Sequence, residues 1–373
     1  MELYALCIVK GMDVRMIKTY KNMPRVLLIS PLPPPPGGDS IWALRYMSYS
    51  KKHTLPIEIV NTAVIGKRAE NVDDSKSIIE EIRRCFKIWS NIKKKIVDFN
   101  PQVIHMNTNC SPKGIIRDYI SARIINSKRI PMIIHCRCNI EDQLGNSTIG
   151  KYFLKKIAEL SKLVIVLNTS SEKYMNQVSK TKTKIVANFV NDDFIMSEHR
   201  QINKEMKQIL FVGHVKRTKG VSEIIEAARE FPELRFVIAG PITEEFSDFK
   251  TNSNVKLIGS QSIDKIKNLL LESDLFLFPT YTEGFSNALL EAMATGIPII
   301  TTNVGANESM IENKGGIIIN KQTYEEISRA INVLESQEVR IEMSKWNIKK
   351  VKENYTIQKV VDELNDIYCK VRI

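Results

Sequence analysis

The chain has 373 residues, of which 43% are hydrophobic and 26% are charged, and this excludes a largely disordered protein. The length predicts two domains, each with its own hydrophobic core. No apolar run of about 18 residues is present, which excludes a predicted spanning helix. Lys10, Asp13 and Arg15 interrupt any signal-like segment. We therefore expect a cytoplasmic protein.

The charge is unevenly distributed along the chain. The formal net charge is +12, but residues 1–190 carry +16 and residues 191–373 carry −4. A basic half favours an anionic partner, and nucleic acid, an acidic glycan and an anionic membrane surface all fit. A requirement for solubility explains the same charge without any partner.

The six cysteines have no regular spacing, which indicates reduced thiols in a cytoplasmic protein. Cys136 and Cys138 lie beside His135 and resemble part of a zinc site. No second pair occurs at zinc-site spacing, so buried thiols are favoured and no metal site is predicted.

The first convincing strand is Arg25–Ser30, and residues 1–22 form an extension of unclear role. A proline run leads to Gly37 and Gly38, with Asp39 or Ser40 as the expected N-cap of a helix. Strand, glycine turn and helix form the opening unit of an open α/β sheet. Further strands are predicted at 57–60, 103–106, 132–134, 163–167 and 185–186, with helices at 75–98, 115–125 and 152–160.

The same alternation begins again at residue 208. Strands are predicted at 208–213, 236–239, 255–258, 275–278 and 297–301, and helices at 221–230, 264–271, 287–294, 323–334 and 357–371. The fold class is therefore α/β, with two doubly wound Rossmann-like domains and a ligand cleft between their facing strand ends. The predicted domains are residues 23–190 and 191–355, followed by a C-terminal helix within 356–373.

One segment, Tyr281–Gly296, carries the clearest functional pattern. Glu283 and Glu291 lie eight positions apart around the start of a predicted helix, with Ser286 as its expected N-cap, and small residues stand between them. A helix N-terminus favours anions, and a carboxylate on each side suits hydroxyl groups. The pattern therefore favours a nucleotide-sugar, in which a diphosphate lies between a sugar and a ribose.

This segment, with its E-x7-E spacing, resembles the donor-binding signature of glycosyltransferase family 4. Phe211–Gly220 resembles the first strand-loop-helix of the family's donor domain, Asn188–Asn191 its interdomain segment, and Lys162–Asn168 a strand of its first domain. The resemblance implies a GT-B fold, sugar transfer with retention of configuration and no metal or other cofactor. It also implies that the C-terminal helix crosses back to the first domain.

The resemblance assigns roles to individual residues. Glu283 would hold the donor sugar, Glu291 the nucleotide ribose, and Lys219 the diphosphate, with Arg217 as a weaker candidate. His214 stands where many members have arginine, and a neutral histidine contributes less charge. His135 matches a family position that faces the donor sugar, although a structural histidine is an equal alternative.

The catalytic candidates are therefore Glu283, His135 and Lys219. The donor-binding candidates are Gly37, Gly38, Gly213, His214, Arg217, Lys219, Glu283, Gly284, Phe285, Ser286, Asn287, Ala288 and Glu291.

We expect a retaining glycosyltransferase that uses a UDP-sugar. A lipid-linked glycan acceptor in surface polysaccharide synthesis, with peripheral contact at the inner face of the membrane, fits the basic N-terminal half. The alternatives are a nucleotide-sugar epimerase of the same fold and a non-catalytic binding protein for nucleotide-sugars or nucleic acid. Aromatic residues do not interleave with basic ones, so nucleic acid is not expected.

Overall fold

The computed structural model describes residues 20, 22–35, 37–63, 78–112, 114–247, 252–320 and 322–372. The chain forms two compact units. The first unit comprises Met1–Val186 and Ile357–Ile373, and the second comprises Ala187–Thr356. The predicted extension of residues 1–22 lies outside the described residues except for Tyr20 and Asn22.

The first unit contains a six-stranded parallel sheet in the order β2-β1-β3-β4-β5-β6. Its strands are short apolar runs covered on both faces, as expected for a parallel sheet. The strands are β1 (Val26–Ser30), β2 (Ile57–Asn61), β3 (Val103–Thr108), β4 (Met132–Cys136), β5 (Leu163–Val166) and β6 (Thr183–Ile185).

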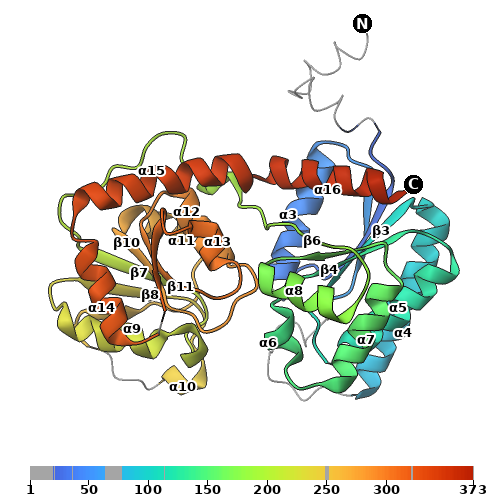
Figure 1. Ribbon diagram of the computed structural model, residues 1–373, viewed down its shortest axis with the longest axis horizontal. Helices are drawn as coiled ribbons and strands as arrows, with labels where there is room; N and C mark the ends of the chain where they lie inside the picture. Colours follow the sequence, from blue (N-terminus) through green and yellow to red (C-terminus); the bar gives the residue numbers. More distant parts are fainter. Residues whose placement is uncertain are drawn as a thin grey trace, which may run out of the picture. The chain divides into compact units, whose positions relative to one another are not determined.

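Helices cover both faces of this sheet (Figure 1). One face is covered by α3 (Gly38–Lys52) and α16 (Ile357–Arg372). The other face packs its aliphatic core against α4 (Ile78–Phe99), α5 (Gly114–Ser127) and α7 (Thr148–Glu159). Two further helices, α6 (Ile140–Leu144) and α8 (Thr169–Val178), were not predicted from the sequence.

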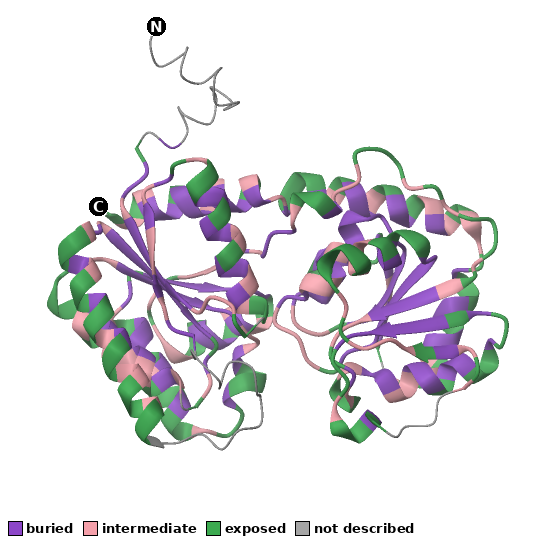
Figure 2. Ribbon diagram, turned by 180° about the vertical axis from the view of Figure 1, so that it is seen from behind, coloured by how far each residue is buried: buried purple, intermediate pink, exposed green. Residues whose placement is uncertain are grey.

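The second unit contains another six-stranded parallel sheet, in the order β12-β11-β10-β7-β8-β9, which is a Rossmann-type order. Its strands are β7 (Gln208–Val212), β8 (Arg235–Ala239), β9 (Val255–Leu257), β10 (Leu275–Phe278), β11 (Ile299–Thr302) and β12 (Gly316–Ile319). Figure 2 shows that the central strands of both sheets are buried, whereas the helices expose their outer sides.

The helical elements of the second unit are η2 (Asp192–Phe194), η3 (Arg217–Lys219), α9 (Val221–Ala227), η4 (Ala228–Glu230), α10 (Glu244–Ser247), α11 (Ile263–Glu272), α12 (Asn287–Ala294), α13 (Asn307–Ile311), α14 (Tyr324–Val333) and α15 (Gln337–Asn354). The sequence reading missed β12, α10, α13 and α15. Its failure at α15 has a clear cause, because this helix buries the polar residues Arg340, Ser344 and Asn347 beside apolar ones. Such a buried face has no apolar periodicity to detect.

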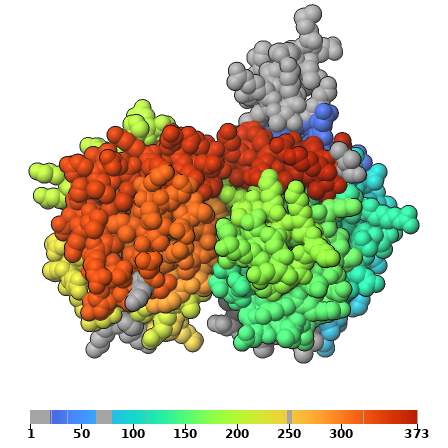
Figure 3. Space-filling view, viewed as in Figure 1, coloured from blue at the N-terminus to red at the C-terminus, as the bar shows by residue number. Residues whose placement is uncertain are grey.

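The C-terminal helix α16 belongs to the first unit, as the family resemblance implied. Tyr368 on α16 is buried against His105 of β3, and Figure 3 shows the outer side of the helix at the surface. At the N-terminal end, the buried Tyr20 donates from its hydroxyl to Asp362 on α16 (2.6 Å). None of the helices in the described ranges combines the length and the hydropathy needed to span a membrane.

Candidate active site

The turn between β10 and α12 in the second unit carries the E-x7-E segment. Ser286 caps α12, and its side chain accepts from the backbone N–H of Leu289 (3.2 Å), as the sequence predicted. Glu283 therefore lies in a loop before the helix, whereas Glu291 lies in its second turn. The N–H groups of Asn287 and Ala288 are at the first helical positions, where no intrahelical acceptor exists.

Lys219 and Glu283 form the ionic centre of this site. The Lys219 Nζ lies 2.5 Å from Glu283 Oε1 and also donates to the carbonyl of Thr282 (3.0 Å). Their side chains are 14% and 19% exposed, so the pair is shielded but open to a ligand. Two residues that are 64 positions apart in the sequence thus meet at the carboxyl edge of the second sheet, where open α/β sheets bind ligands.

Two glycines allow the loops to approach closely enough for this contact. Gly220 follows Lys219 with φ +74°, and a Cβ there would lie 2.2 Å from the carbonyl oxygen of Pro279. Gly305 has φ +58°, and a Cβ there would lie 2.2 Å from the carbonyl oxygen of Glu283. The position of the Glu283 loop therefore depends on glycine at both contacts.

The neighbouring candidates in the loop after β7, His214 and Arg217, lie in different surroundings. His214 follows Gly213, and its pKa is lowered by partial burial of the ring and by the charges of Lys216 and Lys219. The exposed side chain of Arg217 pairs with Glu245 on α10 (3.5 Å). The structure therefore brings Lys219 to Glu283 and directs Arg217 elsewhere.

The remaining candidates of the α12 turn are positioned by packing. Phe285 is buried against Tyr355, with ring centroids 5.8 Å apart, and Asn287 accepts from the side chain of Asn188 (2.9 Å). The Gly284 carbonyl accepts from the N–H of Ala306 (3.1 Å). These contacts hold the turn in place, and Glu291 is partly exposed on α12.

In the first unit, Gly37 is the N-cap of α3 and Gly38 is its first residue. The expected cap, Asp39 or Ser40, was wrong. The Ser40 hydroxyl donates to the carbonyls of Pro35 and Gly37 instead, and Asp39 lies in the first turn. A Cβ on Gly37 would meet only the Ser40 side chain, at 3.9 Å, so the local backbone does not require glycine there.

His135 lies in a fully buried hydrogen-bonded chain. Arg137 Nη1 lies 3.2 Å from His135 Nε2, and His135 Nδ1 lies 3.1 Å from His105 Nε2. His105 Nδ1 then contacts the Tyr368 hydroxyl (2.6 Å), which contacts the Tyr46 hydroxyl (3.2 Å).

The direction of this chain follows from Arg137, which can only donate. His135 Nε2 must therefore accept, and a neutral His135 carries its proton on Nδ1 and donates to His105. Burial, reinforced by the charge of Arg137, lowers the pKa of His105 to about 3 and that of His135 well below its usual range. Both ring nitrogens of His135 are engaged, which favours a positioning role, and its catalytic role stays a prediction.

Arg137 and Asp39 form the end of the chain nearest the carboxyl edge of the first sheet. Arg137 Nε lies 3.7 Å from Asp39 Oδ1, and the guanidinium stacks on Trp42 at 4.3 Å. Burial lowers the pKa of Arg137 to about 10 and raises that of Asp39 to about 6. The sequence reading missed Arg137, although it follows His135 by only two positions.

The three cysteines near β4 do not form a metal site with His135. Successive side chains of a strand point to opposite faces, so Cys136 joins the aliphatic core while His135 faces α3 and α16. Hydrogen bonds from Cys136 and Cys138 lower the pKa of Cys110 to about 5. Over the described part of the chain, no three His, Cys, Asp or Glu side chains are grouped to hold a metal ion.

Comparisons with known proteins show what the second unit and the whole chain resemble. Residues 192–353 match the family model described as glycosyl transferases group 1. The capsular polysaccharide biosynthesis glycosyltransferase CapM of Staphylococcus aureus is 25% identical over 355 residues, covering 86% of this chain and 92% of that protein. UDP-Gal:alpha-D-GlcNAc-diphosphoundecaprenol alpha-1,3-galactosyltransferase of Escherichia coli is 24% identical over 322 residues, covering 78% and 80%.

Among solved structures, sucrose-phosphate synthase from Thermosynechococcus elongatus superposes with a TM-score of 0.74 at 15% identity. The match covers 93% of this chain and 98% of that one. The fold of the chain is therefore GT-B, as predicted.

Proposed function

We propose that this chain moves a sugar from a UDP-sugar to an acceptor hydroxyl with retention of configuration. The chain is a glycosyltransferase, and its residues 192–353 match the model of group 1 glycosyl transferases. The acceptor class that we propose is a lipid-linked glycan of surface polysaccharide synthesis. The observation that carries the proposal is the 2.5 Å contact of Lys219 with Glu283 beside the N-terminus of α12.

The charges of this site suit the bond that must break. In glycosyl transfer the anomeric carbon becomes positive while the departing diphosphate becomes negative. Lys219 and the N–H groups of Asn287 and Ala288 provide positive potential for the diphosphate, and Glu283 provides a carboxylate for the sugar. A bound donor would exchange the Lys219–Glu283 contact for contacts of each residue with the ligand.

The proposed step balances without another reactant. The acceptor oxygen forms a bond to the anomeric carbon as the bond from that carbon to the phosphate oxygen breaks. The acceptor approaches the face of the sugar that the diphosphate leaves, which retains the configuration, and the departing diphosphate takes the acceptor proton. Lys219 and the helix N–H groups neutralise the leaving group in this scheme, so we propose that no metal is required.

The donor and acceptor classes rest on the relatives. The E. coli relative is named for a UDP-sugar donor and a diphosphoundecaprenol acceptor, and the S. aureus relative for capsular polysaccharide synthesis. The basic first half of the chain is compatible with an anionic lipid-linked acceptor. We propose that Glu291, on the second turn of α12, holds the nucleotide ribose.

The test measures nucleotide release from UDP-, GDP- and ADP-sugars, with and without a membrane lipid extract, for the wild type and for Glu283→Gln. We expect acceptor-dependent release of UDP that falls at least a hundredfold in the variant. Arg217→Gln is the matched control, because its side chain pairs with Glu245 away from this site.

Other outcomes favour the alternatives. Conversion of the donor to an isomer without acceptor would identify an epimerase. Donor binding without turnover, in the presence of lipid extract and of soluble glycan acceptors, would identify a binding protein.

A further inference from the structure

Three cysteines of the first unit lie together at the carboxyl edge of its sheet. Cys110 is in the loop after β3, Cys136 is the last residue of β4, and Cys138 lies two residues further on. All three belong to the aliphatic core or pack against it, so they are on the same face of the sheet. Cys110 and Cys136 are fully buried, whereas Cys138 is partly exposed, and all three are free thiols. The cluster is therefore buried but has one member within reach of solvent.

The strand register brings Cys110 opposite Cys138. In the parallel pair of β3 and β4, Thr108 is the partner of Cys136, and the ladder continues with a hydrogen bond from the N–H of Arg137 to the carbonyl of Thr108 (2.8 Å). Extending this register by two positions places Cys110 opposite Cys138, at a strand spacing of about 4.8 Å. Cys136 is offset from Cys110 by a further 6.6 Å or so along the strands, which gives about 8 Å. Disulfides join residues whose Cα atoms are about 4.4–6.8 Å apart, so the register favours Cys138 as the partner of Cys110.

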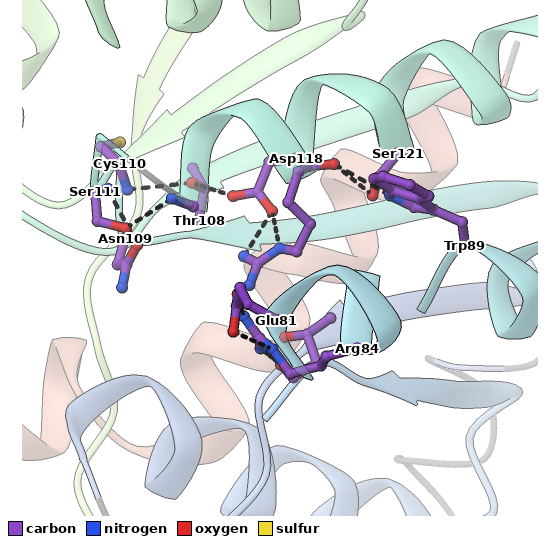
Figure 4. Close-up of polar contacts among 12 residues, drawn as sticks. Glu81, Arg84, Trp89, Thr108, Asn109, Cys110, Ser111, Asp118 and Ser121 are labelled. Atoms are coloured by element: carbon purple, nitrogen blue, oxygen red, sulfur yellow. Dashed lines mark hydrogen bonds and ion pairs between the residues drawn. The ribbon is translucent and has the colours of Figure 1, made fainter. Parts of the chain in front are cut away.

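The loop that carries Cys110 is held in place by hydrogen bonds, as Figure 4 shows. The backbone N–H of Cys110 donates to the hydroxyl of Thr108 (3.1 Å), and this hydroxyl donates to Asp118 on α5 (2.7 Å). Asp118 is itself buried and accepts from the guanidinium of Arg117 (2.7 Å). The position of the Cys110 sulfur beside the end of β4 is therefore fixed by α5.

The three thiols also contact one another. Hydrogen bonds from Cys136 and Cys138 lower the pKa of Cys110 to about 5, although burial and the charge of Asp118 act in the opposite direction. The same hydrogen bonds, together with burial, raise the pKa values of Cys136 and Cys138 well above the usual range, so these two stay protonated. The cluster thus holds one nucleophilic thiolate beside a thiol that can displace a group from it. Such a pair is the arrangement of redox-sensing cysteines.

We propose that Cys110 and Cys138 form a reversible disulfide when the protein meets hydrogen peroxide, which makes the first unit a redox switch. The Cys110 sulfur attacks one peroxide oxygen, the O–O bond breaks, and hydroxide leaves with the electron pair, so that Cys110 becomes a sulfenic acid. The Cys138 sulfur then attacks the Cys110 sulfur, the S–O bond breaks, and the hydroxyl leaves with the Cys138 proton as water. A thiol such as glutathione reduces the disulfide again.

The disulfide would act on the residue between the two β4 cysteines. Arg137 directly precedes Cys138, and its guanidinium stacks on Trp42 beside Asp39. A disulfide brings the two sulfurs to about 2.05 Å, much closer than a hydrogen bond does, so the backbone next to Arg137 must move. We therefore expect the oxidised form to have lower activity. This consequence rests on the proposed function, whereas the disulfide itself does not.

The test treats the reduced full chain with hydrogen peroxide, blocks the remaining thiols with N-ethylmaleimide and maps the disulfides by mass spectrometry after digestion with trypsin. Trypsin cuts after lysine and arginine, so the three cysteines fall on separate peptides, residues 96–113, 130–137 and 138–151. We expect a link between the peptides of Cys110 and Cys138, and dithiothreitol should separate them.

Single substitutions distinguish the roles of the two cysteines. Cys138→Ser should lose the link and leave a sulfenic acid at Cys110, which dimedone traps. Cys110→Ser should lose both the link and the sulfenic acid. Cys85→Ser is the matched control, because Cys85 is a partly exposed thiol on α4 outside the cluster, and this variant should form the link as the wild type does. Thermal unfolding checks that every variant is folded.

Nucleotide release before and after oxidation tests the effect on activity. Peroxide should lower the release about tenfold in the wild type and in Cys85→Ser, since small displacements near a site have effects of this size, and dithiothreitol should restore it. Cys110→Ser cannot begin the reaction, so peroxide should leave its release close to its own reduced value.

The inference is overturned if the oxidised wild type has no link between Cys110 and Cys138, or if Cys110 is joined to Cys136 instead. It is also overturned if the link forms and nucleotide release is unchanged, or if Cys110→Ser is inactivated like the wild type. Absence of release from the reduced wild type would contradict the proposed function, and the peptide map would still decide whether the disulfide forms.

Discussion

The two sheets end in ionic pairs of different character at their carboxyl edges. In the second unit, Lys219 and Glu283 are in direct contact and both remain partly exposed. In the first unit, the Arg137 side chain is 1% exposed, hydrogen-bonds to His135 and lies 3.7 Å from Asp39, whose side chain is 25% exposed. An accessible lysine can exchange its partner for a ligand, whereas a buried arginine that is hydrogen-bonded to a buried histidine fixes the position of its surroundings. The second unit's pair therefore suits the proposed donor chemistry, and the first unit's pair suits a positioning role.

The largest expected effect comes from breaking the accessible pair. Lys219→Met removes the cation nearest the proposed diphosphate, and kcat/KM should fall by about 10²–10³. Arg217→Met, which changes an exposed cation two residues away, should lower kcat/KM by less than about threefold. Steady-state nucleotide release measures both, and equal losses would contradict the distinction between the two residues.

The buried chain of the first unit should make stability depend on pH. His105 and His135 stay neutral in the folded state because their pKa values are lowered, whereas unfolded histidines take up protons below about pH 6.5. The free energy of unfolding is therefore largest above this pH and decreases as the pH falls below it. At pH 5 each histidine should cost about 2 kcal/mol relative to pH 7.

Asp39 acts in the opposite direction, since its raised pKa of about 6 makes its ionised form less favourable in the folded state. That contribution should offset about 1 kcal/mol of the loss between pH 7 and pH 5. Hydrogen exchange of the β3 and β4 amides at the two pH values measures the net change. Unchanged protection would show that the histidines are not held neutral.

Two glycines give a further contrast. Gly220→Ala should destabilise the second unit by about 2 kcal/mol, because φ +74° is strained for alanine and the new Cβ meets the Pro279 carbonyl. Gly37→Ala should change stability by less than about 0.5 kcal/mol, because its φ of −167° is extended and the space is open. Urea unfolding checks both. Lower activity of Gly37→Ala without lower stability would support a ligand contact at this loop.

A smaller effect than that of Gly220→Ala is expected for Tyr368→Phe, which removes the hydroxyl between His105 and Tyr46. Loss of these two buried hydrogen bonds should cost about 1–2 kcal/mol in the free energy of unfolding. Starting the chain at Met23 should also destabilise α16, since it removes the Tyr20–Asp362 contact. Thermal unfolding of the shortened chain measures this loss of stability.

Local patterns predicted much of the fold and part of the site. Apolar runs such as Leu275–Phe278 identified buried strands, and Ser286 was recognised as a helix cap, because these features depend on neighbouring residues. The long helix α15 was missed because its buried face is polar, and β12 was missed although its sequence is apolar. In the first unit, the sequence indicated His135 but not the Arg137 that engages its second ring nitrogen.

By itself, the sequence determined the alternation of strands and helices, the presence of two α/β domains and the loop that carries Glu283. These follow from periodicity, capping and turn residues, which act over a few positions. Tertiary structure alone decided which polar side chains meet. Lys219 pairs with Glu283, Arg217 pairs with Glu245, and Tyr368, near the C-terminal end of the chain, hydrogen-bonds to His105. Such contacts depend on strand order and loop geometry, which bring distant residues to the same sheet edge.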